Sequence, residues 1–74
     1  MPKDPDTVAL TRDLPAEGLA EGDLGAIVHA YPGGETYEVE FVSLTGETIA
    51  VVTLPGEALR SVQSGEIAHV RQLA

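Results

Sequence analysis

The feature that most constrains the fold is a strict alternation of apolar and acidic side chains over residues 36–42. Tyr37, Val39 and Phe41 alternate with Glu38 and Glu40. Successive side chains of a β-strand point to opposite faces of its sheet, so this period of two predicts a half-buried strand. We expect the three apolar side chains to lie in the core and the two glutamates to lie on a solvated face.

Glycine and proline interrupt the rest of the chain at short intervals. The 74 residues include 8 Gly and 5 Pro, and no window keeps a 3.6-residue apolar period over three helical turns. A long helix is therefore excluded. The short runs between these breaks predict further strands over residues 7–11, 23–31, 48–54 and 59–62.

The order of these segments predicts the fold class. Residues 24–54 contain three strand candidates joined by short turns, which is typical of an antiparallel meander. A long loop over residues 13–23 precedes the meander, and its Leu14 and Leu19 are expected to tuck under the sheet. One turn of 3₁₀ helix is expected at 55–58. We therefore predict an all-β fold, a small five-stranded antiparallel SH3-like barrel, with an open antiparallel sheet of the same strands as the alternative.

The chain is long enough for one domain only, which we place at residues 7–62. Residues 1–6 hold two prolines and three charged residues, so we expect a flexible tail there. Residues 63–74 extend beyond the barrel. Their last part, residues 67–73, alternates weakly and indicates either an edge strand or a helical turn.

The strand candidate at 23–31 is apolar on both faces. A period of two puts Ile27, His29 and Tyr31 on one face and Val28 on the other. At its first residue, we expect the Asp23 carboxylate to accept backbone N–H groups in a tight turn. The alternative is an anion-binding nest, but a phosphate-binding loop would contain more glycine and a lysine.

Composition limits the partners. Asp and Glu number 12 against 4 Lys and Arg, giving a net charge of -8. Binding to nucleic acid or to an anionic membrane needs clustered basic residues, so neither is expected. The charge instead favours a basic protein partner, unless it only keeps a small domain soluble. Without an apolar leader or a span of about 18 apolar residues, a cytoplasmic protein is expected.

No pattern in the sequence predicts catalysis. There is no cysteine, and Ser43, Ser61 and Ser64 have no base nearby in sequence and no nucleophile elbow. A chain of this size is also expected to leave little room for a pocket of about 300 Å³. We therefore expect no catalytic residue and no cofactor.

Metal binding has weak support in the sequence. His29 and His69 lie far apart and lack the spacing of zinc ligands. Glu38 and Glu40 are two residues apart on one strand face and could hold a hard cation. We expect no metal, and keep a metal- or small-ligand-binding protein that uses His29 and the glutamate pair as an alternative.

Several motifs resemble a family of short bacterial proteins of unknown function. They include Asp13-Leu14-Pro15, Gly22-Asp23-Leu24-Gly25 and Tyr37-Glu38-Val39-Glu40-Phe41, within a D-L-P…G-L…G-D-x-G-x-V…Y-E-V-E-F…G…L pattern over roughly residues 7–62. The resemblance implies a strand order similar to SH3-like barrels, such as those of nitrile hydratase β subunits and ribosomal KOW-type domains. Members are sometimes encoded beside toxin-like or nuclease-like genes, which implies an antitoxin- or immunity-type role. The family has no established catalytic residues to carry over.

These observations together predict a non-enzymatic acidic protein-binding module that occludes a basic partner. Acidic residues of the first loop and the strand face would meet the partner's Lys and Arg, and apolar residues would anchor the complex. The candidate partner-binding residues are Glu17, Leu19, Glu21, Asp23, Tyr31, Glu38, Glu40 and Ile67. The alternative is a self-associating structural or accessory domain, in which Ile67–Val70 pairs with an exposed sheet edge of a second copy.

Overall fold

The alternating segment forms an inner strand of the sheet, β3 (Thr36–Val42), with the bounds expected from its sequence. Tyr37, Val39 and Phe41 are 2%, 0% and 2% exposed, and Glu38 and Glu40 between them are half-buried on the opposite face. The prediction that the apolar side chains point inward is confirmed. The computed structural model describes residues 6–73.

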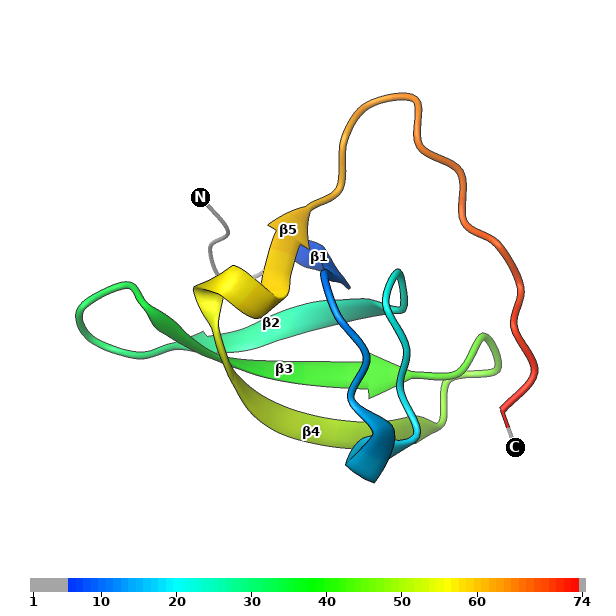
Figure 1. Ribbon diagram of the computed structural model, residues 1–74, viewed down its shortest axis with the longest axis horizontal. Coiled ribbons are helices and arrows are strands. Elements are labelled where there is room, and N and C mark those ends of the chain that lie inside the picture. The colour runs from blue at the N-terminus through cyan, green and yellow to red at the C-terminus, as the bar shows by residue number, and fades with distance from the viewer. Residues whose placement is uncertain (1–5, 74) are drawn as a thin grey trace.

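Five strands form one antiparallel sheet in the order β4-β3-β2-β1-β5. Figure 1 shows β2, β3 and β4 side by side, with β1 and β5 on the side of β2 away from β4. Two 3₁₀ turns lie between strands, η1 before β2 and η2 before β5. The remaining elements are β1 (Thr7–Leu10), η1 (Pro15–Glu17), β2 (Leu24–Ala30), β4 (Thr48–Pro55), η2 (Gly56–Ala58) and β5 (Leu59–Ser61).

The sheet is open. Its outer strands are β4 and β5, and within residues 6–73 no backbone ladder joins them. The predicted all-β, five-stranded antiparallel fold is confirmed, but its closure into a barrel is not. β5 has only three residues and pairs with β1. The chain leaves the sheet directly after β5, so within the described residues it forms no second ladder that would join β5 to β4.

A change of register between Ile27 and His29 alters which side chains of β2 face the core. Ile27 lies opposite Val39 and is 1% exposed, whereas His29 lies opposite Glu38 and is exposed. The extra residue in the bulge reverses the alternation beyond it. The prediction that Ile27, His29 and Tyr31 share one face is therefore wrong.

The core lies on one face of the sheet and includes residues of the first loop. Leu14 and Leu19 exchange backbone hydrogen bonds of 2.9 and 3.1 Å and pack against the core, as predicted. Gly18 closes η1 with a φ of 72°, a conformation that glycine adopts at little cost. The core cluster contains Val8, Leu10, Leu19, Ile27, Tyr37, Val39, Phe41, Leu54, Ala58 and Leu59.

Residues 62–73 form neither strand nor helix, and we call them the C-terminal strap. In Figure 1 the strap leaves β5, arcs away from the sheet and ends near the turn between β3 and β4. The edge strand or helical turn expected at 67–73 is absent. Residues 62–72 are exposed, so they bury too little apolar surface to fix a regular conformation.

At the other end, the tail expected at residues 1–6 falls mostly outside the described residues, which begin at Asp6. The carbonyl of Asp6 accepts a hydrogen bond from the backbone N–H of Ile27 at 2.9 Å. This residue is therefore attached to β2 and does not belong to a free tail.

Candidate partner-binding surfaces

The face of the meander opposite the core presents Glu38, which is held by two hydroxyl groups. The Tyr31 hydroxyl donates to Glu38 Oε1 at 2.9 Å, and the Thr53 hydroxyl donates to the same oxygen at 2.7 Å. These two hydrogen bonds, from Thr53 first and Tyr31 second, lower the pKa of Glu38, and the Glu38 carboxylate in turn raises the pKa of Tyr31. Glu38 is therefore kept ionised and fixed in position.

Glu40 is held in the same way, since the Thr48 hydroxyl donates to its Oε2 at 2.8 Å. Neither glutamate forms an ion pair with an arginine within residues 6–73. The three arginines of that range pair elsewhere: Arg12 with Glu57 at 3.9 Å, Arg60 with Glu66 at 2.8 Å, and Arg71 with Asp23. Two positioned carboxylates thus remain uncompensated on this face.

Apolar side chains surround the two glutamates on this face. Val51 lies directly opposite Glu40 in the β3–β4 ladder and is 51% exposed. Leu24, Val28 and Val42 are also 43–50% exposed. We call this set the outer sheet face: Leu24, Val28, Glu38, Glu40, Val42 and Val51.

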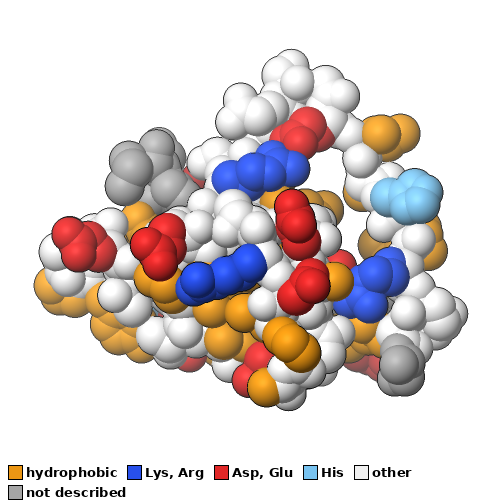
Figure 2. All heavy atoms as spheres, viewed as in Figure 1, with side chains coloured by type: hydrophobic (Ala, Val, Ile, Leu, Met, Phe, Trp, Pro, Cys, Tyr) orange, Lys and Arg blue, Asp and Glu red, His pale blue; other side chains and the backbone are white. Residues whose placement is uncertain are grey.

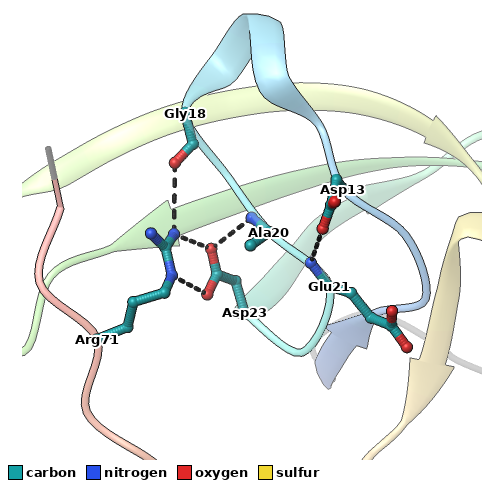
Figure 3. Close-up of polar contacts among 6 residues, drawn as sticks. All are labelled: Asp13, Gly18, Ala20, Glu21, Asp23 and Arg71. Carbon is teal, nitrogen blue, oxygen red and sulfur yellow. Dashed lines mark hydrogen bonds and ion pairs between the residues drawn. The ribbon is translucent and has the colours of Figure 1, made fainter.

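A second polar cluster lies in the first loop, where Asp23 binds Arg71 of the strap (Figure 3). Arg71 Nε donates to Asp23 Oδ1 at 3.1 Å, and one terminal nitrogen donates to Oδ2 at 2.5 Å and to the Gly18 carbonyl at 3.3 Å. The backbone N–H of Ala20 donates to Asp23 Oδ2 at 2.9 Å. The predicted backbone bonding of Asp23 is confirmed, but its partner Arg71 was not foreseen.

The other candidate residues are distributed unevenly. Leu19 is only 5% exposed, so it belongs to the core and is not available as a surface anchor. Ile67, on the strap, is 93% exposed. Glu17 and Glu21 are exposed loop residues, and the Glu21 backbone N–H donates to Asp13 Oδ1 at 2.9 Å. The fold therefore unites only Tyr31, Glu38 and Glu40 on one face.

On the face of the molecule drawn in Figure 2, Lys and Arg side chains lie beside Asp and Glu side chains. An open surface groove of about 630 Å³ also lies at one end of the sheet, lined in part by Glu35, Pro55, Glu57 and Leu59. Its size contradicts the expectation that the chain has little room for a pocket.

Within residues 6–73 no three His, Asp or Glu side chains gather as a metal site would require.

Replacing Arg71 with alanine should raise the pKa of Asp23 and remove a pH-dependent part of the stability. The Arg71 hydrogen bond is the main cause that lowers the Asp23 pKa below its ordinary value of 3.8. A carboxylate with a lowered folded-state pKa contributes stability above its ordinary pKa, and that contribution is lost as the pH falls through the lowered value.

The wild type should therefore exceed Arg71→Ala in unfolding free energy near neutral pH by no more than about 1 kcal/mol, because the pair is partly exposed. Urea unfolding of both proteins as a function of pH measures the difference. The two curves should converge at acid pH. A difference that persists below the Asp23 pKa would contradict this explanation.

The fold is a small all-β domain that carries two clusters of acidic side chains, one on the outer sheet face and one in the first loop. The family model described as Domain of unknown function (DUF4926) matches residues 5–61, and the chain belongs to that family. Comparison with curated proteins and with solved structures found no match. No helix in the described part of the chain is both long and apolar enough to cross a membrane.

Proposed function

We propose that this protein is a non-enzymatic binding module that docks a basic protein partner on its outer sheet face. The observation that supports this most strongly is the pair Glu38 and Glu40, which are held by hydroxyl groups, lack an ion-pair partner within residues 6–73, and stand among exposed apolar side chains. A partner arginine or lysine would find its counter-charge already oriented.

The composition of the face fits protein recognition. Apolar side chains such as Val51 and Val42 would supply burial at the centre of the contact, while the two carboxylates would select a basic partner and speed its approach. With a net charge of -8, the whole chain attracts cations over a longer range. The partner would be an intracellular basic protein, such as a toxin or nuclease that an antitoxin or immunity protein occludes.

We also propose that this fold is related to SH3-like barrels. The strand order β4-β3-β2-β1-β5, the long loop before β2 and the 3₁₀ turn before β5 support it. Peptide-binding SH3 domains use an aromatic-lined groove, and Tyr37 and Phe41 are buried here, so proline-rich ligands are not expected.

Capture of partners from the native host tests the proposal. We expect the wild-type full chain to retain a basic protein that the double variant Glu38→Lys, Glu40→Lys no longer retains. The control is Glu35→Lys, Glu47→Lys, which changes the net charge equally at exposed turn residues outside the outer sheet face. Capture that survives reversal of Glu38 and Glu40, or is lost equally in the control, would refute this site.

Self-association is a second candidate, favoured by the free edge of β4. This edge strand is eight residues long and carries no charged side chain, although such charges commonly protect exposed edges. Ile67 and Val70 of the strap are 93% and 76% exposed and would pair with that edge in a second copy. Light scattering over a range of concentrations decides, since a monomer throughout would exclude this candidate.

A further inference from the structure

We propose that Gly18, Asp23 and Ile49 form a recognition site for an extended segment that carries an arginine and, two residues later, an apolar side chain. The chain's own Arg71 and Leu73 occupy this site as an intramolecular ligand. This inference deepens the proposed function and rests on it for the natural ligand, which would be an arginine-bearing segment of the basic partner.

The polar half of the site is shaped for a guanidinium group. Asp23 receives Arg71 through both carboxylate oxygens, and the Gly18 carbonyl accepts a further N–H from the same group. The Ala20 N–H orients the carboxylate from behind, as Figure 3 shows. Two parallel N–H donors in one plane distinguish arginine from lysine, so the geometry selects arginine.

The apolar half lies next to it. Ile49 of β4 and Leu73 of the strap are both half-buried, and they line a cavity of about 200 Å³ together with Gly18 and Arg71. Side chains two residues apart point to the same side of an extended chain. An Arg-x-Leu segment can therefore place its guanidinium on Asp23 and its apolar side chain beside Ile49.

The C-terminal strap, which carries Arg71 and Leu73, is attached weakly to the rest of the fold along its length. Residues 62–70 are exposed, and the side-chain bonds between the strap and β5 lie close to β5, from Arg60 to Glu66 and from Gln63 to the Ser61 carbonyl. Opening the strap thus exposes little apolar surface that was buried. Furthermore, the family match ends at residue 61, so it includes Gly18, Asp23 and Ile49 but neither Arg71 nor Leu73. The site belongs to the family domain, and its occupant lies outside that match.

A tethered ligand competes strongly with a free one, because the short strap gives Arg71 a high local concentration at Asp23. A free arginine-bearing segment should therefore bind the wild type poorly. Removal of the Arg71 side chain should open the site. The strap acts as an autoinhibitory segment that a partner must displace.

Fluorescence anisotropy with a labelled peptide of residues 66–73 tests this in the full chain. We expect Arg71→Ala to bind the peptide at least about tenfold more tightly than the wild type does. Adding Asp23→Asn to Arg71→Ala should abolish binding, although asparagine can still accept the Ala20 N–H and support the loop. A peptide with lysine in place of its arginine should bind Arg71→Ala at least about tenfold more weakly.

Circular dichroism of each variant verifies folding, and Arg71→Lys provides a second variant that keeps the positive charge. It should bind the peptide more tightly than the wild type does, because lysine holds Asp23 less well. Equal affinity of wild type, Arg71→Ala and Arg71→Lys, or binding that persists without Asp23, would overturn the site.

The outer sheet face is tested separately. Glu38→Lys, Glu40→Lys should leave peptide binding unchanged in the Arg71→Ala background. A variant that loses partner capture but still binds the peptide reports on the outer sheet face and not on the arginine site. Failure of the peptide to bind any variant, with partner capture intact, overturns only the arginine site.

Discussion

Phe41→Ala should leave the protein largely unfolded at room temperature. Phe41 is 2% exposed and has the largest fully buried side chain of the described residues, on β3 between β2 and β4. Truncating a buried phenylalanine to alanine costs about 3–5 kcal/mol. A domain of this size without disulfides is typically stable by only about 3–5 kcal/mol, so the loss is comparable with the whole stability.

Urea unfolding followed by circular dichroism measures this effect. Val42→Ala is the matched control, because Val42 is the next residue of the strand and is 50% exposed, so its loss should change stability by within about 0.5 kcal/mol. A Phe41→Ala protein that still unfolds cooperatively at a midpoint close to that of the wild type would contradict the assignment of Phe41 to the core.

Gly25→Ala should be the second most damaging change. A Cβ atom at Gly25 would lie 2.7 Å from Val39 Cγ1 and 2.8 Å from Phe41 Cε1, both well inside normal contact. Val39 and Phe41 are buried and cannot move away freely. Overpacking of this kind costs about 1–3 kcal/mol, which is a large share of the expected stability.

Gly56→Ala serves as the control for Gly25→Ala. Its added Cβ would meet Tyr37 Cε2 at 3.4 Å, an ordinary contact, so we expect a smaller loss. A double-mutant cycle with Phe41→Leu sharpens the test, since a smaller side chain at position 41 should reduce the cost of alanine at position 25. Fully additive effects would show that the ring is not what excludes the methyl group.

Local patterns predicted the strands well and the long-range contacts poorly. Alternation predicted both bounds of β3, because a half-buried strand leaves its period in the sequence. The bulge at Ile27–His29 changes the face of Tyr31 but depends on the pairing of β2 with β3, which no local pattern records. The approach of the Phe41 ring to Gly25 is also set by that pairing.

The residues of the candidate site also divide into those that local patterns predicted and those that depend on long-range contacts. The two glutamates were predicted from alternation, and the neighbouring Thr53 and Val51 could be recognised only once the β3–β4 register was known. Leu19 was predicted both to tuck under the sheet and to anchor a partner, and burial in the core excludes the second role. Arg71 is 48 residues from Asp23 in sequence, and a lone arginine in an irregular segment gives no signal of its partner.

The chain has a net charge of -8, and the acidic residues of its candidate surfaces are of two kinds. Asp23 is neutralised by Arg71, whereas Glu38 and Glu40 are held ready by hydroxyl groups of Tyr31, Thr53 and Thr48. Asp23 can bind a cation of a partner only after Arg71 is displaced, whereas Glu38 and Glu40 can bind one directly. The outer sheet face should therefore govern first encounter with a basic partner, and the first loop should act later.

The most direct test of this account is the association rate constant of the captured partner, measured at low and at high salt. Wild type should associate at least about tenfold faster than Glu38→Lys, Glu40→Lys at low salt, because oriented charges steer encounter. The two rates should approach each other as salt screens the charges. Equal rates for the two proteins at low salt would contradict the central role of the outer sheet face.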